Sequence, residues 1–359
     1  MKKQSLKDIR EKLQKKDREI VKLLNERTEL SIEVGRAKNT QGRAAYDPSQ
    51  EGKVYDHVRE INEGPLPEDA LKNIFREIIS SSRALQEPTL VAYLGPEASF
   101  CYLAAQSHFG TSAHYYAQTK VSEVFDEVEK GRIDWGVVPV ENSFEGPVKT
   151  TLDRLIATPL NIRAEIFLRV SHCLISPRTK MEEIKRVYSH PQALAQCQNW
   201  LRRNIPNATL IEVDSTIAAA KRVSEDQEGA AIGSSLAAAT YGLTIIAEAI
   251  EDSPLNTTRF FVIGRGHSTA TGKDKTSILF ATSHVPGALY QILGPFAREG
   301  VNLTRIESYP MRYKIGKYLF FVDFAEHRDE KKTKKCLVDV EGATTFFKIL
   351  GSYPQGEEP

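Results

Sequence analysis

The chain has 359 residues, of which 41% are hydrophobic and 26% charged, and its formal net charge is +1. This length predicts two or three domains, each large enough to bury a core. The near-neutral charge argues against a nucleic-acid partner, so any anionic ligand must be bound by locally placed arginine and lysine side chains.

Cysteine usage and the amino terminus exclude further classes. Cys101, Cys173, Cys197 and Cys336 are scattered, which indicates neither a disulfide framework nor a zinc site. We expect no metal and no cofactor. The first residues lack the apolar core of a signal peptide and no membrane-spanning stretch follows, so we expect a cytoplasmic protein without a membrane partner.

Three compositional regions follow one another along the chain. Residues 1–87 have helical spacing of apolar residues and little strand signal. Residues 89–264 alternate short strands rich in valine and isoleucine with alanine-rich helices, which is typical of α/β folds. After a linker rich in glycine, serine and threonine, residues 275–359 show a strand, helix, strand, strand, helix pattern.

The first predicted helix, from about Ser5 to Lys38, has an apolar line interrupted by a cation. Leu6, Leu13 and Ile20 lie on one heptad line, and Arg27 is its next member. At 1.5 Å per residue the helix is roughly 50 Å long. The rest of this segment is too short to cover an apolar stripe of that length, so we expect the helix to pair with another copy.

Further polar side chains are expected to face the same interior. Lys38 lies about 20° from Arg27 around the helix. Ser82 and Gln86 continue the apolar stripe of a third helix, from about 67 to 86, and Asp47 precedes a second helix that starts at Pro48. The pattern fits either buried salt bridges with a helix cap or a pocket for a small dianion.

The motif of this region resembles the all-helical chorismate mutase family. It reads Leu6-x-x-Ile9-Arg10-x-x-Leu13 and, further on, Glu26-Arg27, Glu33-Val34-Gly35-Arg36-Ala37-Lys38. The resemblance assigns Arg10, Arg27, Lys38, Asp47, Glu51, Ser82 and Gln86 to the site.

The family also implies roles for these residues. Arg10 and Arg27 would hold the two carboxylates of chorismate, Lys38 and Gln86 would donate to its ether oxygen, and Asp47 or Glu51 would take the ring hydroxyl. Arg10 points about 100° away from Arg27 and would come from the partner subunit of an intertwined dimer. This chain has Gln50 where related enzymes usually have arginine. The alternative that this domain serves only in dimerisation is therefore kept.

Six segments of the middle region lie where predicted strands end or begin. Alone, each has a structural explanation; for example, Asn142-Ser143 could cap a helix. Together they lie where open α/β sheets bind ligands. In order and spacing they resemble the prephenate dehydratase family; they are Tyr93–Phe100, Val138–Ser143, Thr151–Asp153, Ser189–Ala193, Ser215–Thr216 and Asn256–Phe260.

This resemblance implies two α/β lobes, like those of periplasmic binding proteins, with the site in the cleft. Thr258 would donate a hydrogen bond to the departing hydroxyl, and Arg259 would orient Thr258 or hold a carboxylate. Glu141 is the alternative to Thr258 as the acid that helps the hydroxyl leave. The other residues expected at the substrate are Ser99, Asn142, Ser143, Gln192, Thr216 and Phe260.

The carboxyl-terminal region resembles the ACT regulatory domain, a βαββαβ unit. Pro286–Leu289 opens its first helix, and Gly300–Pro310 leads into its second strand. In dehydratases such segments bind phenylalanine at a domain interface. The resemblance implies Gly287, Ala288, Leu289, Asn302, Leu303, Glu307 and Ser308 as regulatory residues. A purely structural dimerisation module is the alternative.

The sequence therefore predicts a multidomain enzyme with an all-α mutase domain, a two-lobed α/β dehydratase domain and an α+β ACT domain. It would convert chorismate to prephenate, and prephenate to phenylpyruvate with loss of CO2 and water, under allosteric control by phenylalanine. We expect a homodimer or a higher homo-oligomer. Two alternatives are kept: a dehydratase that acts on arogenate, and a non-enzymatic amino-acid sensor.

Overall fold

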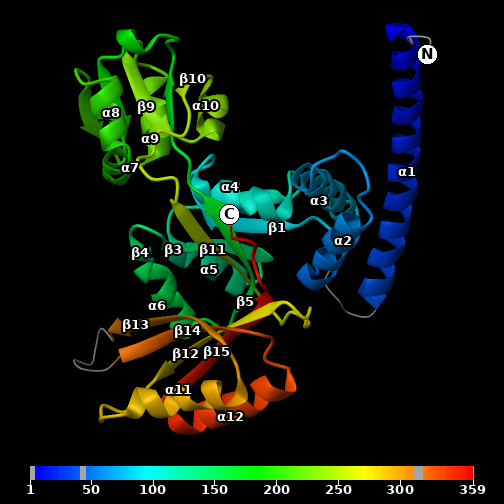
Figure 1. Cartoon of the computed structure of the whole chain (residues 1–359), viewed down its shortest axis with the longest axis vertical. Helices are drawn as coiled ribbons and strands as arrows, with labels where there is room; N and C mark the ends of the chain where they lie inside the picture. The colour runs from blue at the N-terminus through cyan, green and yellow to red at the C-terminus, as the bar shows by residue number, and fades with distance from the viewer. Residues whose placement is uncertain (1–4, 41–45, 311–317, 359) are drawn as a thin grey trace. The chain divides into compact units, whose positions relative to one another are not determined.

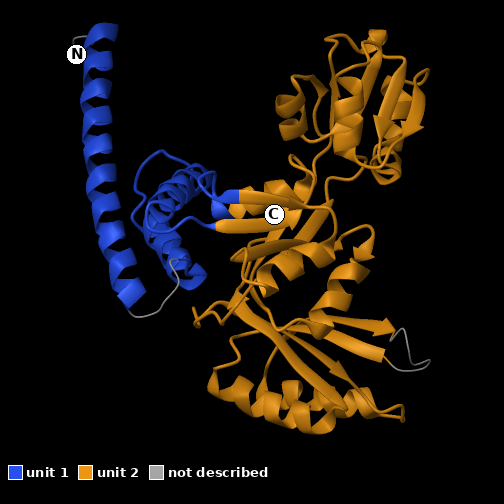
Figure 2. Cartoon of the chain, turned by 180° about the vertical axis from the view of Figure 1, so that it is seen from behind, with its two compact units in different colours: residues 1–89, 109–114 blue, residues 90–108, 115–359 orange. Residues whose placement is uncertain are grey.

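The structure, a computed structural model, describes residues 5–40, 46–310 and 318–358. The chain forms two compact units, residues 1–89 with 109–114 and residues 90–108 with 115–359 (Figure 2). Among the described residues, no helix combines the length and the apolar character needed to cross a membrane.

The first unit is built from the three helices that the sequence predicts. They are α1 (Leu6–Thr40), α2 (Pro48–Glu60) and α3 (Glu68–Ala84). Asp47 caps α2, since its side chain accepts hydrogen bonds from the backbone N–H groups of Ser49 and Gln50, and Pro48 occupies the first turn. Both α1 and α2 pack against α3.

Helix α1 leaves its predicted apolar line exposed. It has 35 residues, and Leu6, Leu13 and Ile20 along it are 66%, 59% and 53% exposed. The exception is near the end of the helix, where Gly35 is buried against Gln86 of the segment after α3. A Cβ atom at Gly35 would lie 2.7 Å from Gln86 Cγ, so glycine is needed for this close approach.

The second unit begins with a mixed sheet in the order β2-β1-β3-β11-β5, with β4 paired to β3. Strand β1 runs parallel to β3, whereas β11 lies between β3 and β5 and runs antiparallel to both. The strands are β1 (Leu90–Leu94), β2 (His114–Gln118), β3 (Trp135–Asn142), β4 (Gly146–Pro147), β5 (Asn161–Arg169) and β11 (Thr257–Gly264). The helices of these segments are α4 (Phe100–Phe109), α5 (Val121–Glu129) and α6 (Lys149–Ala157).

A second sheet in the order β10-β6-β9-β7-β8 forms another lobe. Its presence confirms the two-lobed α/β expectation. The strands are β6 (Cys173–Ser176), β7 (Arg186–Ser189), β8 (Thr209–Glu212), β9 (Gly229–Gly233) and β10 (Thr244–Ala247). The helical segments are η1 (Met181–Glu183), α7 (Pro191–Gln196), α8 (Gln198–Asn204), α9 (Thr216–Val223) and α10 (Ser235–Tyr241).

Two chain segments cross between these lobes, and they lie side by side. One joins β5 to β6 and the other joins β10 to β11. The Val170 N–H donates to the Asn256 carbonyl, the Ile250 N–H donates to the His172 carbonyl, and the His172 N–H donates to the Glu251 carboxylate. The start of β11, which carries Thr258, therefore lies at this double connection.

The carboxyl-terminal region has the predicted βαββαβ order and forms a sheet in the order β13-β14-β12-β15. Helices α11 and α12 cover one face of it (Figure 1). The elements are β12 (Asp274–Ala281), α11 (Ala288–Glu299), β13 (Leu303–Pro310), β14 (Tyr318–Ala325), α12 (Lys331–Ala343) and β15 (Phe346–Pro354).

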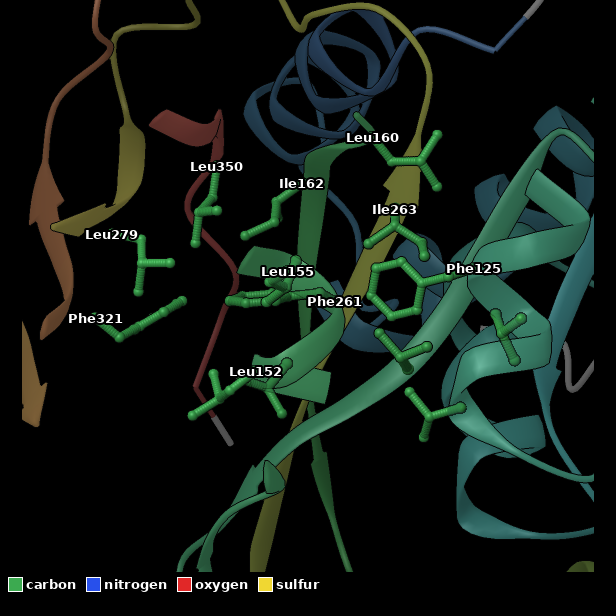
Figure 3. Close-up of a cluster of buried hydrophobic side chains, with 14 of the residues drawn as sticks. Phe125, Leu152, Leu155, Leu160, Ile162, Phe261, Ile263, Leu279, Phe321 and Leu350 are labelled. Carbon is green, nitrogen blue, oxygen red and sulfur yellow. The ribbon is translucent and has the colours of Figure 1, made fainter. Parts of the chain in front are cut away.

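The other face of this sheet shares a hydrophobic core with the first lobe. Leu279, Phe321 and Leu350 from β12, β14 and β15 belong to the same buried cluster as Leu155 and Phe261 (Figure 3). The rings of Phe261 and Phe321 lie 6.2 Å apart between centroids. The regulatory-type sheet and the strand that carries Thr258 are therefore packed as one body.

Candidate active sites

A cavity of about 300 Å³ lies within the helical unit. The residues assigned to the mutase site, except Arg10, all line it: Arg27, Lys38, Asp47, Glu51, Ser82 and Gln86. Arg10 is exposed near the other end of α1. The structure thus brings together the residues of one chain and leaves Arg10 apart from them.

Arg83 also lines this cavity, and the sequence did not single it out. Its guanidinium is buried and binds the Glu51 carboxylate at 2.6 Å, the Phe109 carbonyl at 2.6 Å and the Thr89 hydroxyl at 3.1 Å. Burial raises the pKa of Glu51, and Arg83 opposes this by lowering it. Nothing in the local pattern distinguishes Arg83 from a surface arginine, because its partner Phe109 is distant in sequence.

Polar groups from α1, from α3 and from the segment just after α3 line the cavity. Gln86 Nε2 donates to Ser31 Oγ at 2.7 Å, and the Ser82 hydroxyl donates to the Ile78 carbonyl at 2.7 Å. The Ser82 oxygen therefore keeps lone pairs to accept a hydrogen bond. Arg27 lies over the Phe75 ring at 5.9 Å, and no carboxylate among the described residues forms an ion pair with it. A cationic group in a half-apolar cavity suits an anionic ligand.

The second site lies where β3 and β11 pair beside the double connection. Thr258 is opposite Asn142, and Arg259 is opposite Glu141. Because successive strand residues point to opposite faces, Thr258 and Asn142 share one face while Arg259 and Glu141 share the other. Asn142 Nδ2 donates to Thr258 Oγ1 at 2.8 Å. Among the described residues, none accepts a hydrogen bond from the Thr258 hydroxyl.

A chain of amide side chains continues from Asn142 into the second lobe. Its Nδ2 also donates to Asn256 Oδ1 at 2.9 Å, and Asn256 Nδ2 donates to Gln196 Oε1 at 2.9 Å. The same Gln196 oxygen lies 3.0 Å from His172 Nε2. Sequence reasoning missed Gln196 and His172 as site residues. The usable signal for Gln196 was its place one helical turn after Gln192.

His172 is the buried end of this chain. It is 3% exposed, and its Nδ1 has no hydrogen-bond partner within the described residues. Burial lowers its pKa from the ordinary value of 6.5. The imidazole and the Phe100 ring are nearly perpendicular, with centroids 5.6 Å apart.

On the opposite face of the strand pair, Arg259 is enclosed by carboxylates of the protein. Its side chain is 3% exposed and donates to Glu165 at 2.6 Å, to Asp323 at 2.6 Å and to the Tyr353 hydroxyl at 3.2 Å. The Glu141 carboxylate lies 3.5 Å from Arg259 and 2.5 Å from Arg305. Arg259 and Glu141 therefore lie behind the strands and do not share the face of Thr258.

Ser143 and Ser99 make local backbone contacts. Ser143 Oγ donates to the Leu255 carbonyl at 2.9 Å and accepts from the Thr257 N–H at 3.1 Å. Ser99 Oγ accepts from the Tyr102 N–H and donates to the Leu94 carbonyl. Ser143 thus ties the loop after β3 to the start of β11, and Ser99 stabilises the start of α4.

The remaining predicted substrate residues lie at other positions of the dehydratase lobes. Gln192 is half-buried in the first turn of α7, and Thr216 is half-buried at the first position of α9. Phe260 is only 2% exposed and belongs to the interior of β11.

A second cavity, of about 640 Å³, lies at the start of α11. Gly287, Ala288 and Leu289 line it together with Tyr318 and Phe320. Gly287 adopts a left-handed conformation with φ of 80°, which favours glycine. The other predicted regulatory residues do not line this cavity. They are Asn302, just before β13, and Leu303, Glu307 and Ser308 on β13. Nearby on β13, Tyr309 is buried and donates to Asp153 of α6 at 2.7 Å.

Comparisons with known proteins connect these sites to families. Residues 9–87 match chorismate mutase type II, residues 91–268 match prephenate dehydratase, and residues 276–342 match the ACT domain. The bifunctional chorismate mutase/prephenate dehydratase of Aquifex aeolicus is 42% identical over 98% of this chain and 98% of its own length. The chain belongs to the bifunctional chorismate mutase/prephenate dehydratase family. Both activities follow from this membership.

Solved structures agree with the assignment of the dehydratase and ACT domains. A prephenate dehydratase from Arthrobacter aurescens, solved in complex with L-Phe, is 35% identical with a TM-score of 0.68, covering 74% of this chain and 89% of that one. A chain described as a novel type of quorum quenching acylase is 30% identical with a TM-score of 0.67, covering 74% and 97%. One fold can host different activities, so the full-length bifunctional relative carries the family assignment.

Proposed function

We propose that the helical cavity rearranges chorismate to prephenate and that the β3–β11 site converts prephenate to phenylpyruvate. The observation that carries the proposal is the hydrogen bond from Asn142 Nδ2 to Thr258 Oγ1. It leaves the Thr258 hydroxyl hydrogen available to a ligand on the same face. The family membership supplies the two substrates.

In the mutase cavity the reaction is pericyclic and needs neither a nucleophile nor a proton transfer. What lowers the barrier is a folded substrate conformer and positive charge near the breaking ether bond. Arg27 holds one carboxylate, Lys38 and Gln86 donate to the ether oxygen, and Glu51 or Asp47 accepts from the ring hydroxyl. These residues all line one cavity.

Arg10 belongs to this mechanism only if two copies associate. The exposed apolar line of Leu6, Leu13 and Ile20 on α1 supports such an association, because a long unpartnered apolar stripe is typical of a helix that pairs. In a homodimer, Arg10 of one copy reaches the second carboxylate of chorismate in the other copy's cavity.

In the dehydratase site, two bonds break and an aromatic ring forms. The C–C bond to the ring carboxylate breaks, CO2 leaves, and its electron pair enters the ring. The ring C–O bond breaks with its electron pair on oxygen, which takes a proton from the solvent and leaves as water. Thr258 donates a hydrogen bond to this oxygen, and the bond it accepts from Asn142 strengthens its donation.

Phenylalanine is proposed as the regulatory ligand of the cavity at the start of α11. The backbone N–H groups that follow Gly287 suit a carboxylate, and Tyr318 and Phe320 border the space for an aromatic ring. The segment Asn302–Ser308 lies outside this cavity, so in the proposed homo-oligomer it comes from a second copy.

The test is Thr258→Ala, assayed separately with chorismate, prephenate and arogenate. Loss of the hydroxyl is expected to lower phenylpyruvate formation by at least about 100-fold, with prephenate formation from chorismate unchanged. Thr258→Ser keeps the hydroxyl and should restore most of the activity. Thr209→Ala changes an exposed strand threonine and serves as the matched control.

A Thr258→Ala variant that dehydrates at the wild-type rate removes Thr258 from the mechanism. A wild-type chain that consumes arogenate and not prephenate shifts the substrate assignment. Failure to rearrange chorismate leaves the helical unit as a dimerisation element.

A further inference from the structure

Arg305 lies on β13 of the ACT domain and contacts the dehydratase strand β3. Its Nη2 is 2.5 Å from the Glu141 carboxylate and 2.5 Å from the Glu307 carboxylate. Its guanidinium lies 5.5 Å from the centre of the Phe321 ring. The side chain is 15% exposed, so water competes little for these contacts.

One nitrogen serves both carboxylates. It donates a hydrogen bond to Glu307 and forms an ion pair with Glu141. Within the described residues, the other terminal nitrogen of Arg305, Nη1, is buried without a hydrogen-bond partner. Arg305 therefore divides its bonding between a dehydratase residue and a residue of its own strand.

Glu141 is the residue before Asn142 in β3. Its carboxylate is held by Arg305 and more loosely by Arg259, while the next side chain, Asn142, donates to Thr258 on the opposite face. The pairing of β3 with β11 is irregular just beyond this point, between Arg259 and Phe260. Fixing Glu141 from behind therefore limits the rotation of the strand end that carries Asn142.

We infer that Arg305, supplied by the ACT domain, is a positioning residue of the dehydratase site. It acts through Glu141 on the orientation of Asn142 and hence on Thr258. Because the same nitrogen binds Glu307, a movement of Glu307 on β13 changes the hold on Glu141. The inference deepens the proposed dehydratase function and rests on it.

The primary experiment measures kcat and KM for prephenate in full-length Arg305→Gln. A positioning role predicts that kcat falls by at least about 10-fold, since small misplacements of a catalytic group are costly, with KM within about twofold of wild type. Arg305→Lys keeps the positive charge and should recover most of kcat. The rate of chorismate rearrangement in the same preparation, expected to be unchanged, reports that the chain is folded.

Arg298→Gln is the matched control. Arg298 is another ACT arginine that binds carboxylates, those of Asp339 and Glu299, but it is 57% exposed and belongs to α11. Its removal should leave kcat and KM for prephenate at wild-type values.

A double variant tests the route through Glu141. If Arg305 acts through this carboxylate, Arg305→Gln adds no more than about twofold to the loss in kcat that Glu141→Gln alone causes. A merely structural role predicts that the two losses multiply. Multiplying losses overturn the inference, and so does an Arg305→Gln chain whose kcat stays within twofold of wild type.

The test of Arg305 can fail independently of the proposed dehydratase function. If the wild-type chain does not dehydrate prephenate, the proposed function fails. If the wild type and Thr258→Ala behave as expected while Arg305→Gln is unaffected, only the inference fails.

Discussion

Two adjacent residues of β11 have opposite environments. Thr258 presents a hydroxyl on the face shared with Asn142, whereas Arg259 is buried among the carboxylates of Glu165 and Asp323. A buried cation is tolerated only where anions surround it. Arg259 is therefore bound to groups of the protein, and Thr258 is the residue of this pair that is available to a ligand.

The sequence motif placed Thr258 and Arg259 at one site and did not predict this division. Both belong to β11, where successive side chains leave opposite faces. The partners of Arg259 could not be predicted, because Asp323 and Tyr353 lie on strands that are distant in sequence. Gln196 was missed although it follows Gln192 by one helical turn, because its contact with Asn256 joins residues that are distant in sequence.

His172 makes the stability of the dehydratase lobes depend on pH. Its pKa is lowered by burial from 6.5, so the unfolded chain binds a proton at a higher pH than the folded chain does. The contribution of neutral His172 to the free energy of unfolding is therefore present above about pH 6.5 and is lost as the pH falls below it. The slope reaches at most about 1.4 kcal/mol per pH unit.

We expect His172→Gln to flatten this dependence. Urea unfolding at about pH 7.5, 6.5 and 5.5 measures it, with exposed His57→Gln as the control. An equal loss of unfolding free energy in wild type and His172→Gln on acidification would show that His172 is not the titrating group.

At the scale of elements, the long regular segments were the most predictable from the sequence. The bounds of α1 and α3 and the start of α2 agree with the predictions to within about two residues, because helical spacing and the Asp47-Pro48 start signal are local. The short strands are less predictable. β6 and β10 have four residues each and most positions of β2 are exposed, so their periodic pattern is weak.

Helix α1 provides a prediction that separates the two activities. Leu13→Glu places a charge in its apolar line, where Leu13 is 59% exposed, and should dissociate the proposed dimer. Because Arg10 then no longer reaches the second copy's cavity, mutase activity should fall by about 100-fold. Dehydratase activity should remain.

Sedimentation together with both assays measures this. Lys15→Glu, about 160° from Leu13 around the helix, is the matched control and should stay dimeric. A Leu13→Glu chain that sediments as a monomer with full mutase activity would exclude Arg10 of a second copy from the site.

At the scale of the whole molecule, the ACT sheet and the first dehydratase lobe share one core. Leu279 of β12 is 4% exposed within the cluster that contains Phe261 and Leu155. We expect Leu279→Ala to destabilise both by about 2–5 kcal/mol, whereas Val338→Ala, at a position 68% exposed on α12, should cost less than about 0.5 kcal/mol.

A tryptophan in the dehydratase lobe reports whether the two parts unfold together. Trp135 lies on β3 and Trp200 on α8, so a Trp200→Phe background leaves Trp135 as the fluorescent probe. A lower urea midpoint of Trp135 in Leu279→Ala shows cooperative unfolding. An unchanged midpoint would mean that the ACT domain unfolds on its own.

The sheet order also has a consequence for the growing chain on the ribosome. Strand β11 enters between β3 and β5, and the whole second lobe, from β6 to β10, is synthesised before it. Until β11 emerges, β3 and β5 each have an unpaired edge that can pair with other chains. The helical unit, almost all of which precedes residue 90, is by contrast synthesised early. A chain interrupted before β11 carries the mutase residues and lacks Thr258, so the nascent protein acquires its first chemistry well before its second.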